Sequence, residues 1–285
     1  MVNCILIADS GSTKTDWILS TADNSILAVE TMGINPVRDS QDAIFDIIRN
    51  GLSPKIPKEY NICEIYFYGA GCIEPYKRNV EKTLAHHFGS ATTIEVESDL
   101  LGAARALCGN KEGIACILGT GSNSCLYNGK EIISNTSPLG YILGDEGSGA
   151  FLGKTLVSNI LKKLFSKELQ ESFFEKFHLT PTIIINKVYK EPLPNRFLAS
   201  LVPFLAEHRD NTEIHDMLVN AFRLFFDRNV KAYHHPEMEI NFVGSIAFFF
   251  EKELKEAAEK EGFKVGKILH KPARDIAFFH KKTLI

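Results

Sequence analysis

The sequence contains no long hydrophobic run and carries almost no net charge. No apolar run approaches the roughly 20 residues that a membrane-spanning helix needs. The apolar start, Cys4 to Ala8, is far too short for the core of a signal peptide. The net charge of −3 gives no electrostatic reason for nucleic acid or an anionic membrane to be the main partner. We therefore expect a cytoplasmic protein that binds neither nucleic acid nor a membrane.

Cysteine and histidine lack the spacings that mark metal and redox sites. The six cysteines form no CxxC pair, and several stand in apolar runs, such as Cys116 in GIACILGTG. The nine histidines show neither the HxxxH nor the HExxH spacing. These patterns favour buried, reduced thiols over disulfides or metal ligands.

What is present is a globular composition with a repeated design. Hydrophobic residues make up 45% and charged residues 24% of the 285 residues, which is typical of one large or two medium soluble domains. Up to about residue 107, apolar runs and helical spacings follow the order βββαβαβα. The segment EGIACILGTGSNSCLYNGKEI then repeats the opening strand, glycine turn and strand.

The second half is predicted to be rich in helices, with one strand in EINFVGSIA and another in KVGKIL. The helical patterns cover 149–165, 168–177, 196–208, 214–233 and 248–261. We expect an α/β fold of two related halves with a cleft between them: an N-terminal domain, 1–107, and a C-terminal domain, 108–271. A last helix, Ala273 to Lys281, should return to the first domain within 272–285.

The stretch ADSGSTKTDW places glycine and small hydroxyl residues at the tip of the first predicted hairpin. Backbone N–H groups of such a tip can point at a bound anion, and Ser12, Thr13 and Lys14 add donors beside Gly11. Asp9, at the end of the strand, suits Mg²⁺, which it would usually hold through water. The GxxxxGK(S/T) spacing of a P-loop is absent, and the alternative is a hairpin turn that merely needs glycine.

A second tip of the same kind stands in ILGTGSNSC. There Gly119, Thr120 and Gly121 could cradle a phosphate from the opposite side. Two such tips at matching places in two halves are more specific than either tip alone. Together they predict that the phosphates of a nucleotide bind between the halves.

The pair of tips resembles the actin, hexokinase and Hsp70 ATPase superfamily. Within it, GTGSN followed by GDEGS resembles the N-acetylglucosamine kinase branch, which is grouped with the BadF/BadG/BcrA/BcrD ATPases. The resemblance runs from Asp9 to about Gly153, and FVGSIA matches the adenosine motif more weakly, at Gly244 and Ser245. It implies two ribonuclease H-like domains that flank a nucleotide- and substrate-binding cleft. It also implies ATP with Mg²⁺, and transfer of a phosphoryl group to a hydroxyl, O6 by expectation, of N-acetylglucosamine or a related amino sugar.

Asp99 ends the strand TIEVESD and begins a helix. From the residues alone it is best explained as an N-cap, for which aspartate is well suited. The resemblance instead implies the catalytic base, since the family's catalytic aspartate falls at this strand-to-helix junction. Such a carboxylate accepts the proton of the attacking sugar hydroxyl and aligns that hydroxyl with the γ-phosphate.

The segment LGYILGDEGSGAFLGK contains five of the glycines of the chain around two adjacent carboxylates. The resemblance implies that Asp145 accepts hydrogen bonds from sugar hydroxyls, while Gly144 and Gly147 let the chain pass close to the ring. The alternative for Asp145 and Glu146 is charge complementarity with a helix N-terminus. For Glu146, helix capping and approach to the metal both stay open.

The resemblance implies further sugar contacts from Asn35 in GINP, from Asn123 in GTGSN and from Gly140. The alternative for Asn35 is a turn residue before proline. The family often shows a Gly-Gly-Trp-Gly segment ahead of GDEGS, whereas this sequence reads SPLGY, with Gly140 but without the tryptophan. This departure leaves the sugar open between N-acetylglucosamine, N-acetylmuramate and glucosamine.

Two other functions compete with the kinase. One is a BadF-type ATPase that activates a 2-hydroxyacyl-CoA dehydratase, but that class holds an Fe–S cluster by cysteines, and no close Cys pair is present. The other is a sugar or nucleotide sensor that has lost catalysis, which the presence of all the motif carboxylates disfavours. Phenylalanine-rich helical segments read as core, and one face of them could form a homodimer contact.

Overall fold

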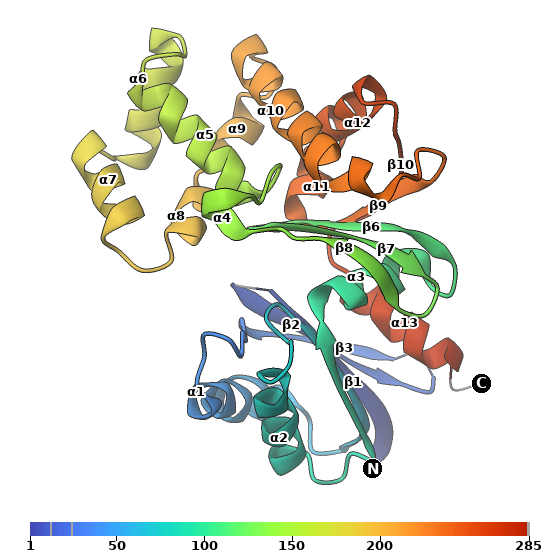
Figure 1. Cartoon of the computed structure of the whole chain (residues 1–285). Coiled ribbons are helices and arrows are strands. Elements are labelled where there is room, and N and C mark those ends of the chain that lie inside the picture. The colour runs from blue at the N-terminus through green and yellow to red at the C-terminus, as the bar shows by residue number, and fades with distance from the viewer. Residues whose placement is uncertain (12, 24, 284–285) are drawn as a thin grey trace. The chain divides into compact units, whose positions relative to one another are not determined.

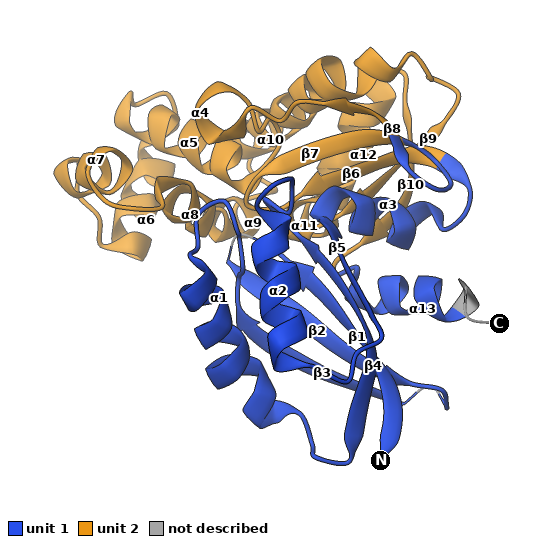
Figure 2. Cartoon of the chain, turned by 60° about the horizontal axis from the view of Figure 1, so that its bottom comes forward, with its two compact units in different colours: residues 1–112, 127–132, 271–285 blue, residues 113–126, 133–270 orange. Residues whose placement is uncertain are grey.

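The computed structural model describes residues 1–11, 13–23 and 25–283 of the chain. It has an α/β fold with two five-stranded mixed sheets and flanking helices, as Figure 1 shows. The chain forms two units, coloured separately in Figure 2. Unit 1 contains residues 1–112, 127–132 and 271–285, and unit 2 contains residues 113–126 and 133–270.

The sheet of unit 1 has the strand order β3-β2-β1-β4-β5. Its strands are β1 (Val2–Ser10), β2 (Lys14–Thr21), β3 (Ile26–Met32), β4 (Tyr60–Gly69) and β5 (Thr93–Ser98). The first three strands are antiparallel neighbours, while β4 runs parallel to both β1 and β5. The central strand β1 is a continuous apolar run because both faces of the sheet are covered. In register, Asp9 lies opposite Asp16 on β2 and Tyr68 on β4.

Helices cover both faces of this sheet. On one face, α1 (Gln41–Asp46), the π-helical turn Ile47–Leu52 and α2 (Lys77–His87) pack over a core that includes Trp17 and Phe67. The rings of those two residues meet edge to face at 5.7 Å. The other face carries α3 (Asp99–Cys108) and α13 (Ala273–Thr283), and α13 contacts α3, β1 and β2. The element order predicted up to residue 107 is confirmed.

The sheet of unit 2 has the order β10-β9-β6-β7-β8. Its strands are β6 (Glu112–Leu118), β7 (Ser122–Asn128), β8 (Ile132–Thr136), β9 (Glu239–Val243) and β10 (Lys264–Leu269). The central strand β6 runs parallel to β9, which runs parallel to β10. The helices of this half are α4 (Gly140–Leu143), α5 (Gly149–Leu161), α6 (Lys167–Phe177), α7 (Pro181–Tyr189), α8 (Pro194–Ser200), α9 (Pro203–Glu207), α10 (Thr212–Phe225), α11 (Ser245–Phe249) and α12 (Glu251–Lys260).

Several helix predictions for this half need correction. The helix expected over 196–208 is two helices, because Pro203 has no N–H to continue α8 and instead begins α9. The helix expected over 248–261 is likewise divided, at Phe250, between α11 and α12. Helix α7 was not predicted, although Thr180 and Pro181 form a cap-and-proline start at which the Thr180 hydroxyl accepts a hydrogen bond from Ile183 N at 3.3 Å.

The core of unit 2 is rich in phenylalanine, which confirms the core prediction for the two helical segments that contain Phe173 and Phe225. Phe173, Phe204, Phe222, Phe225 and Phe242 are fully buried there. Helix α10 continues into a π-helical turn, Phe226–Val230, and a 3₁₀ turn, Lys231–Tyr233. Over the described residues, the structure contains no helix that is both long and apolar enough to span a membrane.

Candidate active site

The β1–β2 tip is a tight turn against which the backbone of Gly33 packs. The Gly11 amide donates a hydrogen bond to the Lys14 carbonyl at 3.0 Å, and the Thr13 carbonyl accepts one from the Gly33 amide at 3.1 Å. A Cβ at Gly33 would overlap the Gly11 carbonyl and crowd Lys14 N, so only glycine fits behind this turn. Sequence reasoning overlooked Gly33, whose signal was its place at the end of the third strand. Ser12, predicted to bind phosphate, lies outside the described residues.

The lysine predicted for this tip is ion-paired. Lys14 Nζ lies 3.0 Å from Glu30 Oε2 and 3.3 Å from Asp16 Oδ2, and Lys271 Nζ lies 2.9 Å from Asp16 Oδ1. Both ammonium groups stay partly exposed at the surface of unit 1. The phosphate role of Lys14 stays a prediction, and Asp16 and Lys271 are charged neighbours that the sequence did not indicate.

Asp9 is a half-buried carboxylate surrounded by other charges. Its pKa is raised to about 7, mainly by burial and in addition by the negative charges of Asp99 and Asp16, while the positive charges of Lys14 and Lys271 lower it. Within the described chain, no group of three or more His, Cys, Asp or Glu side chains could hold a metal ion by itself. A single carboxylate oxygen donor nevertheless fits Mg²⁺, which proteins usually hold by one or two carboxylates together with substrate phosphates and water.

Asp99 occupies the first position inside helix α3, and Ser98 is the residue that caps the helix. The Ser98 hydroxyl accepts a hydrogen bond from Leu101 N at 3.2 Å, while Asp99 Oδ1 accepts one from Leu100 N at 2.9 Å. The capping role that the residues alone suggested for Asp99 is therefore wrong. Burial raises the pKa of Asp99 to about 6, and the Leu100 amide opposes that rise. The charge of Asp99 is also close enough to Asp9 to raise the pKa of Asp9.

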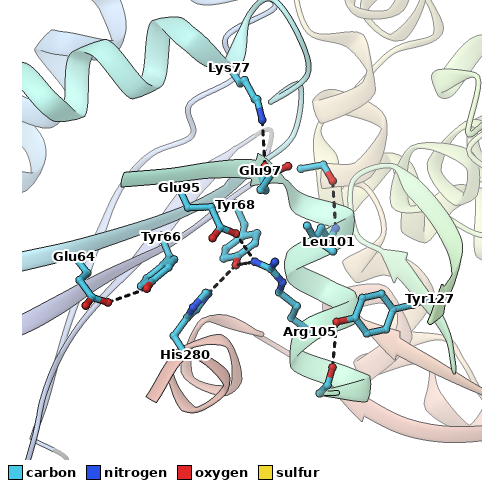
Figure 3. Close-up of polar contacts among 12 residues, drawn as sticks. Glu64, Tyr66, Tyr68, Lys77, Glu95, Glu97, Leu101, Arg105, Tyr127 and His280 are labelled. Atoms are coloured by element: carbon cyan, nitrogen blue, oxygen red, sulfur yellow. Dashed lines mark hydrogen bonds and ion pairs between the residues drawn. The ribbon is translucent and has the colours of Figure 1, made fainter. Parts of the chain in front are cut away.

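A polar network holds α3 in place on the face of the unit 1 sheet that carries α3 and α13 (Figure 3). Arg105 of α3 donates to the Tyr68 hydroxyl and to Glu95, and the Tyr68 hydroxyl lies 2.7 Å from His280 Nε2 of α13. Burial lowers the pKa of His280 to about 3, so the ring is neutral. A Cβ at Gly102 would lie only 2.7 Å from the Tyr68 ring, so glycine at this position allows α3 to pack close to β4. This network fixes the helix whose first residue is Asp99.

The second tip, after β6, is attached to the start of helix α5. The Gly119 amide donates to the Gly121 carbonyl at 2.9 Å. The Gly119 carbonyl accepts from Gly149 N at 2.8 Å, and the Thr120 carbonyl accepts from Ala150 N at 3.0 Å. Two amides at the start of α5 thus fasten this turn to the helix.

Asp145 lies against this second tip. Its Oδ1 accepts a hydrogen bond from Ser122 N at 3.3 Å, and a Cβ at Gly121 would lie 3.2 Å from its Oδ2. The Asp145 backbone is left-handed, with φ 55°, and its amide donates to the Pro138 carbonyl at 2.9 Å. Burial raises the pKa of this carboxyl to about 6, against the effect of the Ser122 amide. The structure therefore brings together a predicted phosphate turn and the predicted sugar-binding carboxylate.

Glu146 points to a different partner. Its Oε1 accepts a hydrogen bond from Arg228 Nη1 at 2.7 Å, and its side chain is only 7% exposed. Helix α5 is capped by Ser148, whose hydroxyl accepts from Phe151 N at 3.2 Å. Of the two roles left open for Glu146, capping is therefore wrong. No motif pointed to Arg228, which lies 82 positions after Glu146 along the chain.

The two predicted asparagines are both tied into turns. Asn35 Oδ1 accepts from Val37 N at 3.1 Å, as the turn alternative for Asn35 predicts. Asn123 Oδ1 accepts from Ser124 N and from Asn135 Nδ2, both at 2.9 Å. The sugar contacts of both residues stay predictions, as does that of Gly140, which begins α4.

The predicted adenosine motif forms a backbone corner that requires glycine. Gly244 has φ 121°, and a Cβ there would overlap the Leu118 carbonyl. Its amide donates to the Leu269 carbonyl at 2.9 Å, and Ser245 begins α11. The corner places β6, β10 and α11 next to one another in unit 2.

Known proteins resemble this chain over its whole length. A protein from Porphyromonas gingivalis, provisionally described as an N-acetylglucosamine kinase, is 43% identical, with a TM-score of 0.96 over 99% of this chain and 100% of that one. A ROK family glucokinase from Streptomyces griseus, solved with glucose and AMPPNP, has a TM-score of 0.63 at 12% identity over 99% and 98% of the two chains, which shows a shared fold.

Among curated proteins, the N-acetylmuramic acid/N-acetylglucosamine kinase of Clostridium acetobutylicum is 27% identical over 208 residues. The match covers 68% of this chain and 66% of the relative, just under two thirds of its length. No family model matches the chain.

Proposed function

The chain belongs to the N-acetylglucosamine kinase-like branch of the BadF/BadG/BcrA/BcrD ATPase family, and from this premise we propose that it phosphorylates a hydroxyl of an amino sugar with ATP. It is a phosphotransferase with an alcohol acceptor. The observation that carries the assignment of its site is the Asp99 carboxylate. It stands at the start of α3, beside Asp9, and is not used as the helix cap.

Asp99 acts as the general base in this proposal. A base must be ionised before the reaction, so that it can accept the proton of the hydroxyl, which becomes more acidic as it attacks the phosphorus. A carboxyl with its pKa raised to about 6 is mostly ionised at neutral pH, yet it is a better proton acceptor than an exposed aspartate. The hydrogen bonds of Arg105 fix the position of α3, and they thereby orient the Asp99 carboxylate at its start.

Asp9 is the residue that would hold Mg²⁺, through water. When bound, the ion would neutralise charge on the phosphates of ATP. A positive charge beside Asp9 would also relieve the repulsion that Asp99 and Asp16 exert on it. The partly exposed ammonium groups of Lys14 and Lys271 lie on the same side of the hairpin, where Asp16 holds them.

The backbone turns supply the nucleotide contacts in this proposal. Glycine and small hydroxyl residues leave N–H groups accessible to phosphate oxygens, and the Gly244 corner would lie beside the adenosine. The residues proposed for ATP are Gly11, Ser12, Thr13, Lys14, Gly119, Thr120, Gly121, Gly244 and Ser245.

Asp145 would accept hydrogen bonds from two sugar hydroxyls, and Asn35, Asn123 and Gly140 would line the same substrate. The names of the P. gingivalis and C. acetobutylicum relatives support N-acetylglucosamine or N-acetylmuramate as the acceptor, and O6 is the proposed position. A homodimer and a cytoplasmic location stay predictions.

The test is to screen amino sugars for ADP release with Mg²⁺-ATP, and to repeat the assay with Asp145→Asn. Wild-type protein should release ADP with N-acetylglucosamine, N-acetylmuramate or glucosamine. The variant should mainly raise the sugar KM, because a binding contact is lost while the base stays in place. A folded wild-type protein that releases no sugar-dependent ADP with any of the three would contradict the proposal.

A further inference from the structure

The ion pair between Glu146 and Arg228 stands directly beside the proposed sugar carboxylate. Glu146 is the next residue after Asp145, and its side chain is 7% exposed, whereas that of Arg228 is 58% exposed. A carboxylate buried to this extent needs a partner, because removing a charge from water is costly when nothing compensates it. Arg228 is the partner that the structure shows, with Nη1 and Oε1 at 2.7 Å.

The backbone at Asp145 needs support from its surroundings. Its φ of 55° lies in the left-handed region, which residues with a Cβ adopt at a cost in free energy. The Asp145 amide donates to Pro138 O at 2.9 Å, and its carbonyl accepts from Ser148 N at 3.1 Å. These bonds fix the main chain on both sides of Asp145, and the Glu146 side chain supplies a further attachment.

Arg228 comes from an irregular part of its helix. It lies in the π-helical turn Phe226–Val230, a kind of turn that frequently occurs at functional sites. The Thr136 hydroxyl donates to the Asn229 carbonyl at 3.0 Å and fixes the turn against β8. A Cβ at Gly147 would lie 3.2 Å from Phe225 Cβ, so the carboxylate segment packs against the end of α10 as well.

We propose that Arg228 is a positioning residue for sugar binding, which acts through Glu146 on the orientation of the Asp145 carboxylate. Arg228 holds Glu146, and Glu146 holds the turn in which Asp145 meets Ser122 N. The inference rests on the proposed function, since Asp145 is assigned to the sugar there. It adds a residue for which neither the motifs nor the relatives' names provide a role.

The simpler alternative is an ion pair that only stabilises the fold, and the same helix offers a matched control for it. Arg223, in the preceding part of α10, pairs with Glu261 at 2.7 Å, and the two side chains are 45% and 11% exposed. This pair resembles Arg228–Glu146 in distance and burial, but Glu261 lies outside the carboxylate segment. Glu261 also accepts a hydrogen bond from Lys231 Nζ at 2.8 Å, so Arg223→Met leaves it one cationic partner. A purely stabilising role therefore predicts a lower stability for both arginine variants, smaller for Arg223→Met, and no change in the sugar KM for either.

The experiment compares Arg228→Met, Arg228→Lys and Arg223→Met in steady-state kinetics, with melting temperatures measured in parallel. Arg228→Met should raise the KM for the sugar by about 10- to 100-fold, the range set by loss of a hydrogen bond to a charged group. The KM for ATP should stay within about twofold, and Arg228→Lys should restore part of the loss. Arg223→Met should lower the melting temperature without changing the sugar KM.

Non-additivity tests whether Arg228 acts through Asp145. In the Asp145→Asn background, Arg228→Met should raise the sugar KM no further, because the contact that it positions is already lost. If Arg228→Met does not fold, the double variant Glu146→Gln/Arg228→Met removes the unpaired charge and takes its place. A larger loss with N-acetylmuramate than with N-acetylglucosamine would overturn the proposal, since it would mean direct contact with the substrate carboxylate.

A crystal structure of the Arg228→Met variant, or of the double variant, gives a readout that does not depend on catalysis. The Asp145 carboxylate should leave the Ser122 amide in that structure. If it stays there and the sugar KM is that of the wild type, the positioning role is wrong. A displaced carboxylate in a protein whose wild type phosphorylates no amino sugar would instead contradict the proposed function and leave the positioning of Asp145 by Arg228 supported.

Discussion

Ser98 caps helix α3 one residue before Asp99, so the two side chains bond to different amides of the same first turn. Ser98 Oγ accepts a hydrogen bond from the Leu101 amide at 3.2 Å, and Asp99 Oδ1 accepts one from the Leu100 amide at 2.9 Å. Ser98 thereby stabilises the start of the helix, which leaves the adjacent Asp99 for the proposed chemistry. Substitutions at the two positions should separate these roles.

Ser98→Ala should lower the free energy of unfolding by about 1 kcal/mol, the typical effect of losing an N-cap, and should leave kcat close to wild type. Asp99→Asn should do the reverse. It keeps the size and a side-chain oxygen, so stability should change little, while kcat should fall by roughly 10²–10⁴-fold through loss of the base. Chemical denaturation and steady-state kinetics on both variants check this. Equal kinetic effects of the two substitutions would return Asp99 to a structural role.

The pH dependence of kcat/KM should report the raised pKa of Asp99. A base works in its ionised form, so kcat/KM should fall as the pH drops through about 6 and should level off at higher pH. An aspartate with an ordinary pKa would keep the enzyme active down to about pH 4. Asp145 has a pKa raised to about 6 as well, so the profile is measured from pH 4.5 to 8.5 at saturating Mg²⁺ on the Asp145→Asn variant, in which Asp99 is the remaining carboxyl of that kind. An acid limb centred near pH 4 in that variant would contradict the assignment.

Asp9 should lower the stability of the ligand-free protein at neutral and higher pH. Its folded pKa of about 7 lies above the unfolded value of 3.8, so between those pH values the folded state binds more protons than the unfolded state. The free energy of unfolding therefore falls as the pH rises through this window, and the whole loss is present above pH 7.

Asp9→Asn removes that charge, so it should raise the free energy of unfolding of ligand-free protein at pH 8 by roughly 1 to 3 kcal/mol. At pH 4 the difference from wild type should disappear. The variant should also lose the stabilisation that Mg²⁺-ATP gives to the wild type. Urea denaturation at the two pH values, with and without Mg²⁺-ATP, is the measurement. If the variant is no more stable than wild type at pH 8, the negative charge of Asp9 does not destabilise the folded protein, and this prediction is wrong.

Gly119 allows a test of nucleotide binding that does not disturb the fold. A Cβ at Gly119 would meet no atom of the protein within 4 Å, and the same holds for Gly89, a surface glycine of unit 1. Both Gly119→Ala and Gly89→Ala should therefore keep the stability of the wild type. Only Gly119→Ala should weaken ATP binding, by about 10-fold or more, because the added methyl group would obstruct phosphate contact with the turn amides. Calorimetric titration with Mg²⁺ and an ATP analogue checks this, and unchanged affinity would remove the second tip from the nucleotide site.

Much of the fold could be predicted because its causes are local. Apolar runs joined by glycine turns predicted the strands on either side of Gly11 and Gly119, and helical spacing predicted α2, α3, α5 and α6. The break at Pro203 also had a local cause, the missing N–H, although the apolar spacing across it read as one helix.

The finer organisation of the site could not be predicted, because it depends on contacts between distant residues. Serine and aspartate are both good N-caps, so ESD alone could not decide between Ser98 and Asp99. Glu146 and Arg228 lie 82 positions apart, and no periodicity connects them. The partners of Lys14 likewise come from neighbouring strands and from Lys271 near the C-terminus.

The most direct measurement of the central claim is phosphorus NMR of a reaction containing Mg²⁺-ATP, the best amino sugar and either wild-type protein or the Asp99→Asn variant. The account predicts that the wild type converts ATP to ADP and one sugar phosphate in equal amounts. It predicts that the variant forms the same product roughly 10²–10⁴-fold more slowly. If the wild type released inorganic phosphate with no sugar phosphate, or if the variant made product at the wild-type rate, the account of an amino-sugar kinase with Asp99 as its base would be contradicted.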